Sequence, residues 1–197
     1  MTTPDPDSKM RILLAARKLF ATKGFDGTTV RQICEEAGVN VALVSYHFGG
    51  KENMFPALFD SFFFPNERIA AINREMEPLE GVKLIIREVT RFRGQDPELI
   101  SIIQQEVILN TSRVHKIREH VVPIWNLLQY WLTEGRTQGV FHFRSLDTAF
   151  MSIVGTLLFH RDSDYWKVMK VEEHISMDEM IEDMTAFILG GLRVQAS

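Results

Sequence analysis

Apolar residues recur every three or four positions along almost the whole chain, and this spacing restricts the fold more than any other feature. In residues 8–23, for example, Ile12, Ala15 and Leu19 share one face of a helix. No alternation of apolar and polar residues is long enough for a strand, which excludes a β-sandwich and a Rossmann-type sheet. The sequence therefore predicts an all-α protein.

Capping residues divide the N-terminal part of the chain into short helices. Ser8 is expected to cap the first helix and Gly24 to follow its end, where glycine adopts the left-handed conformation easily. Thr29 and Gln32 have the spacing of a capping box, which starts a second helix that Gly38 ends. The pattern predicts two helices joined to the next segment by a short turn.

A third helix is expected from its cap Asn40 to about Phe48, and a fourth from about Lys51. Pro56 fits the fourth helix only near its first turn, and Pro123 is expected to kink or divide a later helix. Further helices are predicted at about 66–76, 79–93, 97–110, 113–137, 145–160 and 176–193, and much of 160–176 is expected to be a loop.

The change from short to long helices predicts two domains, an N-terminal domain at 1–55 and a larger helical domain at 56–197. The net charge of the chain is −4. Residues 1–55 carry seven basic and six acidic side chains, whereas residues 56–197 carry fifteen basic and twenty acidic ones. This mild asymmetry permits an N-terminal domain that meets an anion and a C-terminal domain that does not.

Several protein classes are not expected. No apolar run reaches the roughly 18 residues of a membrane span, and the first residues lack a secretory pattern, so a cytoplasmic protein is expected. The single Cys34 excludes an internal disulfide and suits a small buried hydrophobe. His115 and His120 are poorly spaced for a metal. Because no nucleophile–base pair or phosphate-binding glycine loop occurs, we expect no catalytic site, cofactor or metal.

The stretch 40–48 has two different faces when it is placed on a helix. Val41, Val44 and Phe48 fall within about 60° of one another and are predicted to be buried. The opposite side carries Ala42, Leu43, Tyr46 and His47, with Ser45 at its edge. A two-turn helix that exposes apolar and aromatic side chains favours a binding partner on that side.

A helix, a turn containing Gly38 and a second short helix form the helix-turn-helix pattern, whose second helix enters the DNA major groove. Ala42 and Leu43 suit contact with a thymine methyl group, and the other polar side chains suit phosphate oxygens. For Arg31, His47 and Lys51, plain exposure to solvent is the alternative. The predicted DNA-binding residues are Thr29, Arg31, Ala42, Leu43, Ser45, Tyr46, His47 and Lys51.

The segment "ILLAARKLFATKGFDGTTVRQICEEAGVN" followed by "VSYHFGGKENMF" resembles the TetR (tetracycline-repressor-like) family of bacterial transcription regulators over about the first 55 residues. The family's pattern has alanine, serine, serine and leucine where this chain has Cys34, Asn40, Gly50 and Met54. The resemblance implies an all-α homodimer. Each subunit would have an N-terminal DNA-binding domain and a C-terminal domain that binds a ligand and dimerises.

The C-terminal domain offers two candidate surfaces. Aromatic and polar side chains around a helix with a proline suit a pocket for a small apolar or aromatic effector, although aromatic residues at helical spacing are commonly plain core. The predicted ligand-binding residues are Phe92, Trp125, Gln129, Tyr130 and Phe159. Small residues on two apolar helices suit a dimer interface, with burial inside one subunit as the alternative. The predicted interface residues are Ala149, Ile153, Gly155, Phe187, Gly190 and Gly191.

These features predict a sequence-specific DNA-binding regulator, a ligand-responsive repressor that binds a palindromic operator as a homodimer. The ligand would act through the helix from Lys51 to Phe62, which joins the two domains. The alternative is a DNA-bound factor of the same fold that acts through a protein partner, in a cell-cycle or architectural role, without small-molecule control.

Overall fold

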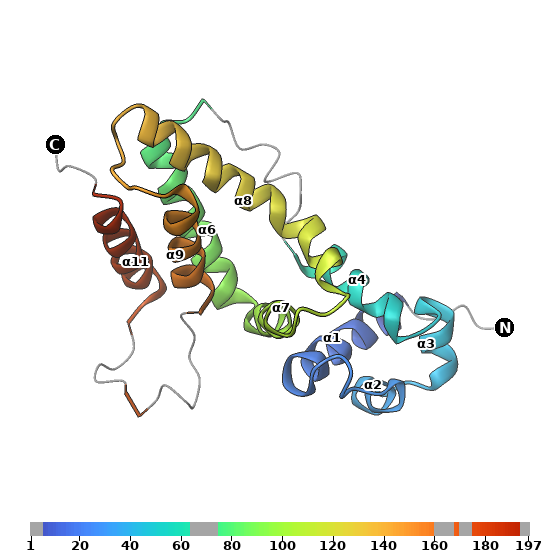
Figure 1. Cartoon of the computed structure of the whole chain (residues 1–197). Helices are drawn as coiled ribbons and strands as arrows, with labels where there is room; N and C mark the ends of the chain where they lie inside the picture. Colours follow the sequence, from blue (N-terminus) through green and yellow to red (C-terminus); the bar gives the residue numbers. More distant parts are fainter. Residues whose placement is uncertain (1–5, 64–74, 160–167, 170–174, 194–197) are drawn as a thin grey trace. The chain divides into compact units, whose positions relative to one another are not determined.

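A computed structural model describes residues 6–63, 75–159, 168–169 and 175–193 of the chain. Every regular element in these ranges is a helix, which confirms the prediction of an all-α fold (Figure 1). No helix in these ranges is long and apolar enough to cross a membrane. The chain divides into two compact units: unit 1 is Met1–Asn66 with Pro97–His120, and unit 2 is Glu67–Asp96 with Val121–Ser197.

Unit 1 contains the short N-terminal helices and a second segment from the middle of the chain. Its helices are α1 (Pro6–Lys23), α2 (Val30–Ala37), α3 (Val41–Phe48), α4 (Lys51–Phe62), α7 (Pro97–Leu109) and the start of α8 (Val114–Thr137). A boundary at residue 55 stays a prediction; α7 and the start of α8 group with the N-terminal helices. Ile12, Phe20 and Phe55 are among its fully buried side chains.

The predicted helix ends are mostly confirmed. Thr29 caps α2 in a complete capping box with Gln32, and Gly38 follows α2 with a φ of 65°. Asn40 caps α3 through the Leu43 amide. Ser8 is not a cap, because α1 already begins at Pro6, whose fixed φ suits the first turn of a helix.

Two helices continue through a proline. Pro56 is the sixth residue of α4, beyond the first turn where it was expected. Helix α8 continues through Pro123, so the predicted division does not occur there, and a kink stays a prediction. Each proline removes one backbone hydrogen bond, a loss that the packing of neighbouring side chains can offset. In α4 that packing comes from buried Phe55 and Leu58 beside the proline.

Unit 2 consists of α6 (Pro78–Gln95), the rest of α8, α9 (Leu146–Phe159) and α11 (Met177–Gly191). Glycines let large rings approach the backbone closely. A Cβ at Gly81 would lie 2.1 Å from the Trp131 ring, and one at Gly135 would lie 2.2 Å from the Phe141 ring. The helix predicted at 66–76 and the loop predicted at 160–176 fall largely outside the described residues.

Candidate DNA-binding interface

Helix α3 buries one narrow stripe, half-buries Leu43 and His47, and exposes its other side chains. Val44 and Phe48 are buried as predicted, whereas Tyr46 is 69% exposed and Ala42 and Ser45 are exposed as well. The prediction that Val41 is buried is wrong, since 53% of it is exposed. As the first residue of α3 it lies beyond the packed turn, because helical side chains lean toward the N-terminus.

The turn between α1 and α2, residues 24–29, is held by its own side chains. Gly24 has a φ of 74°, and the hydroxyl of Thr28 donates to the Gly24 carbonyl at 2.8 Å. The hydroxyl of Thr29 accepts from the Gln32 amide at 3.2 Å while the side chain stays exposed. Thr29 therefore starts α2 at an exposed helix N-terminus, whose free amides favour an anion such as phosphate.

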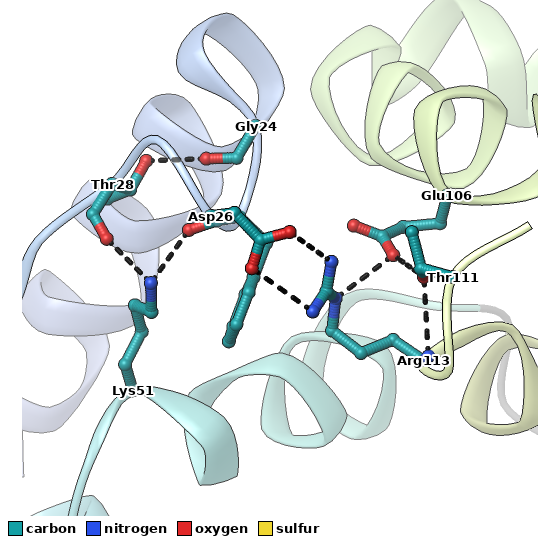
Figure 2. A network of polar contacts seen from close by, with 8 residues as sticks. Gly24, Asp26, Thr28, Lys51, Glu106, Thr111 and Arg113 are labelled. Carbon is teal, nitrogen blue, oxygen red and sulfur yellow. Dashed lines mark hydrogen bonds and ion pairs between the residues drawn. The ribbon is translucent and has the colours of Figure 1, made fainter. Parts of the chain in front are cut away.

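Lys51 lies against this turn rather than in open solvent. Its ammonium donates to the carbonyls of Phe25 and Thr28 at 2.9 and 2.8 Å and lies 4.3 Å from the centre of the Phe25 ring (Figure 2). An ammonium has three hydrogens, so two of them fasten the turn and one is left for a phosphate. A role for Lys51 in holding the turn was missed, because the sequence does not show which carbonyls it reaches.

The other predicted contacts have neighbours of their own. His47 is half-buried, and its Nε2 lies 2.8 Å from the Ser8 hydroxyl of α1. Arg31 pairs with Glu35 at 3.0 Å on the exposed side of α2. Leu43 is half-buried on α3. The predicted DNA-binding residues therefore lie at the N-cap of α2, on α2 and α3 and at the start of α4, and their contact with DNA stays a prediction.

The predicted ligand residues of unit 2 do not surround one described hollow. Phe92 is buried, Trp125 packs edge-on against Phe150 with ring centres 6.2 Å apart, and Phe159 is exposed. Gln129 and Tyr130 are half-buried on α8. Two hollows of about 670 and 530 Å³ lie on the described part of unit 2, and none of these five residues lines either. A pocket built from them stays a prediction.

The hollow of about 670 Å³ lies between α9 and α11 instead. A Cβ added at Gly155, Gly190 or Gly191 would meet no atom within 4 Å, so the glycines face open space in this single chain. Five of the six predicted interface residues line it: Ala149, Ile153, Phe187, Gly190 and Gly191. The dimer interface is not tested by this arrangement, but its residues lie together.

Two side chains of unit 2 stand out that are not in the predicted ligand-binding set, although Trp131 is one of the aromatic residues that suit such a pocket. The Trp131 Nε1 is buried and has no hydrogen-bond acceptor among the described residues. Arg93 is buried in α6, where burial lowers the pKa of its guanidinium. In the sequence Arg93 looks like a solvated surface charge, and only the fold shows otherwise. No group of three or more histidine, cysteine or acidic side chains in the described ranges could hold a metal ion.

Comparison with known proteins shows which proteins this chain is similar to. Residues 12–58 match the family model described as bacterial regulatory proteins, tetR family. The chain is 26% identical over 136 residues to the probable HTH-type transcriptional regulator YttP of Bacillus subtilis, with 66% of each protein covered. It is 44% identical over 52 residues to the HTH-type transcriptional repressor AcnR of Corynebacterium glutamicum, with 26% of this chain and 28% of AcnR covered. The chain thus matches less than two thirds of AcnR and about two thirds of YttP.

A solved structure supports the same relation over most of the chain. The crystal structure of HlyIIR, a hemolysin II transcriptional regulator, is 27% identical, covers 96% of this chain and 98% of its own, and superposes with a TM-score of 0.76. The family model matches the segment that contains α2, α3 and most of α1 and α4. The N-terminal part of the chain, residues 12–58, therefore matches the tetR family of bacterial regulatory proteins.

Proposed function

We propose that the protein is a DNA-binding transcriptional regulator that inserts α3 into the major groove. The observation that carries this proposal is the exposed face of α3, where Ala42, Ser45 and Tyr46 point away from the core that Val44 and Phe48 fill. Exposed side chains on such a helix contact base edges, and residues around it contact phosphates. The family match over residues 12–58 supports the same assignment.

A selection from a pool of random-sequence duplex DNA tests this function. We expect enrichment of one palindromic sequence, and its affinity should fall steeply as salt rises, because phosphate contacts release counterions. Leu43→Ala should change the preferred bases, whereas Tyr46→Phe should lower the affinity for all DNA sequences alike. Arg118→Ala, at an exposed position of α8, is the matched control. Failure to enrich any sequence would refute sequence-specific binding.

We also propose that the regulator acts as a homodimer through α9 and α11. The exposed Phe187, the open glycines of α11 and the hollow of about 670 Å³ support this surface, since small residues let helices approach closely. Phe187→Asp should give monomers in sedimentation experiments and reduce the affinity for a palindrome. A variant that stays dimeric would place the interface elsewhere.

For an effector, we propose a small apolar or aromatic molecule that carries a hydrogen-bond acceptor. The buried Trp131 Nε1, which has no acceptor among the described residues, supports this chemistry, because a buried donor left unpaired costs about 1–3 kcal/mol. A thermal-shift screen of small aromatic carbonyl compounds, repeated on Trp131→Phe, tests it. A ligand that stabilises both proteins equally would show that this donor plays no part.

A further inference from the structure

Arg113 joins two segments of unit 1 that lie 87 residues apart in the chain. It lies between α7 and α8, and its Nη2 and Nη1 donate to the two oxygens of Asp26 at 3.0 and 3.4 Å (Figure 2). Its Nε donates to the Glu106 carboxylate of α7 at 3.0 Å. The guanidinium also lies 4.2 Å from the centre of the Phe25 ring. Every one of these partners belongs to α7 or to the turn at residues 24–29.

Arg113, Asp26 and Glu106 form a junction between α7 and the turn at residues 24–29. The α7 side of this junction is buried and hydrogen-bonded. The Glu106 side chain is 4% exposed, and the Thr111 hydroxyl donates to its carboxylate and accepts from the Arg113 amide. Burial opposes the charge of the guanidinium, but the hydrogen bonds that it donates to Glu106 and Asp26 outweigh burial and raise the pKa of Arg113. The carboxylate of Glu106 therefore holds the guanidinium on the side opposite Asp26.

The Asp26 side is the outer end of the junction. Its side chain is 80% exposed, so the pair alone would contribute little to stability. The two parallel hydrogen bonds nevertheless fix an orientation, because a planar guanidinium matches a carboxylate in only a few geometries. The junction therefore orients the turn at residues 24–29 and not the core of unit 1.

The same turn is held on a second side by Lys51. The Phe25 ring lies within 4.3 Å of both cations, and the Phe25 and Thr28 carbonyls accept from the Lys51 ammonium. The turn ends at Thr29, which starts α2. Displacing Asp26 would therefore shift the carbonyls that hold Lys51 and the exposed amides at the start of α2.

We propose that Arg113 is a positioning residue for DNA binding, which holds the turn at residues 24–29 so that Thr29 and Lys51 meet the DNA backbone together. Arg113 itself touches no DNA in this arrangement. The corner between α7 and α8 thereby controls DNA affinity from outside the reading helices. The inference rests on the proposed function and adds a residue outside the segment 12–58 to its DNA-binding machinery.

The test compares four proteins on the duplex recovered by the selection described above: wild type, Arg113→Ala, Asp26→Asn and the double variant. We expect each single variant to lose about tenfold in affinity, which corresponds to about 1.4 kcal/mol, and the double variant to lose no more than either single one. Asp26→Asn removes a negative charge and would strengthen DNA binding if only long-range attraction mattered. A loss in both single variants is therefore the signature of positioning. Arg118→Ala, which removes a charge from an exposed site, should change affinity little.

The salt dependence separates positioning from direct contact. We expect the slope of log affinity against log salt to stay at its wild-type value in Arg113→Ala. A slope reduced by about 0.9 would mean that Arg113 itself neutralises a phosphate, and would overturn the proposal. Tighter binding by Asp26→Asn, or additive losses in the double variant, would overturn it too.

Folding is controlled in the same series. The thermal midpoint and helical circular dichroism of each variant are recorded, and Asp26→Asn carries the test if Arg113→Ala does not fold, because Asp26 is exposed. If the selection enriches no duplex, the proposed function fails and this inference with it. If a duplex is enriched and all four proteins bind it equally, only the role of Arg113 is refuted.

Discussion

Two arginines show how differently the two units are built. Arg113 of unit 1 lies between two carboxylates, and its hydrogen bonds have directional, charged partners. Arg93 of unit 2 is buried, and its guanidinium donates to the Leu157 carbonyl at 2.7 Å and contacts the sulfur of Met180 at 2.9 Å. No carboxylate pairs with Arg93 among the described residues. The position of Arg113 in unit 1 is thus set by paired charges, and that of Arg93 in unit 2 by a backbone carbonyl and thioether sulfur atoms.

The difference suits the two proposed tasks. A surface that must match DNA phosphates needs fixed positions, and bidentate hydrogen bonds supply them. A unit that must accept different shapes gains from thioether side chains, which are flexible and polarizable. Substitutions in the two units should therefore affect different properties of the protein.

Overfilling unit 2 should be the most damaging change. Gly81→Val would drive new atoms into the Trp131 ring, from which even a Cβ would be 2.1 Å away, and should cost about 3 kcal/mol. Urea unfolding followed by circular dichroism measures the loss. The matched control is Gly190→Ala, a helical glycine with open space around it, which should be neutral or slightly stabilising at monomer concentrations. Equal losses in both variants would contradict the close packing described for α6.

Removing the buried guanidinium of Arg93 should have the second-largest effect on stability. Arg93→Ala leaves the Leu157 carbonyl without its side-chain donor and opens a void, and should destabilise the protein by about 2 kcal/mol. Operator affinity at a temperature where the variant is folded should change little. Asp26→Asn, which changes the exposed partner of Arg113, should show the reverse order, with a small loss of stability and a larger loss of affinity. If Arg93→Ala and Asp26→Asn affected the same property, the contrast between the units would not hold.

Removing the ammonium of Lys51 should have a smaller effect on stability than either change in unit 2. Lys51→Met keeps the apolar stem and loses both carbonyl hydrogen bonds, and should cost about 1 kcal/mol of stability. It should also weaken operator binding. Lys51→Arg keeps the charge but not the compact ammonium, so a full rescue by arginine would assign Lys51 to phosphate contact alone.

The smallest effect concerns the start of α11. Glu179 accepts the Ser176 amide in a capping box, and this hydrogen bond lowers the pKa of the Glu179 carboxyl. Because the pKa is lower in the folded state, the contribution to stability is complete above the unfolded value and disappears as pH falls through the folded value. Urea midpoints of wild type and Glu179→Gln should therefore differ slightly at pH 7 and converge in acid. A difference that grows as pH falls would contradict the assignment.

How far the sequence predicts this molecule depends on the range of each interaction. The caps at Thr29 and Asn40 were predicted correctly, because a capping side chain bonds an amide only three positions away. The burial of Val44 and Phe48 follows from helical spacing. The same spacing wrongly predicted that Val41 is buried, because a helical wheel does not show which turns of a helix are covered by neighbouring elements.

Contacts across the fold could not be predicted in this way. Nothing near Arg113 in the sequence points to Asp26, and the partners of Lys51 are backbone carbonyls, which every residue has. The predicted ligand-binding residues were chosen without knowledge of such distant contacts. Trp125 and Trp131 are both aromatic residues of α8, and only the close approach of Gly81 on α6 distinguishes the buried ring.

The buried Cys34 has a practical consequence for experiments on this protein. It is the only cysteine of the chain, it lies inside α2, and burial raises the pKa of its thiol. A protonated, buried thiol reacts slowly with maleimides and methanethiosulfonates. A cysteine introduced at an exposed position such as Ser45 would therefore take a spin label or fluorophore almost alone. Pulsed resonance or energy transfer between two labelled copies would then measure the separation of their reading helices without first removing the native cysteine.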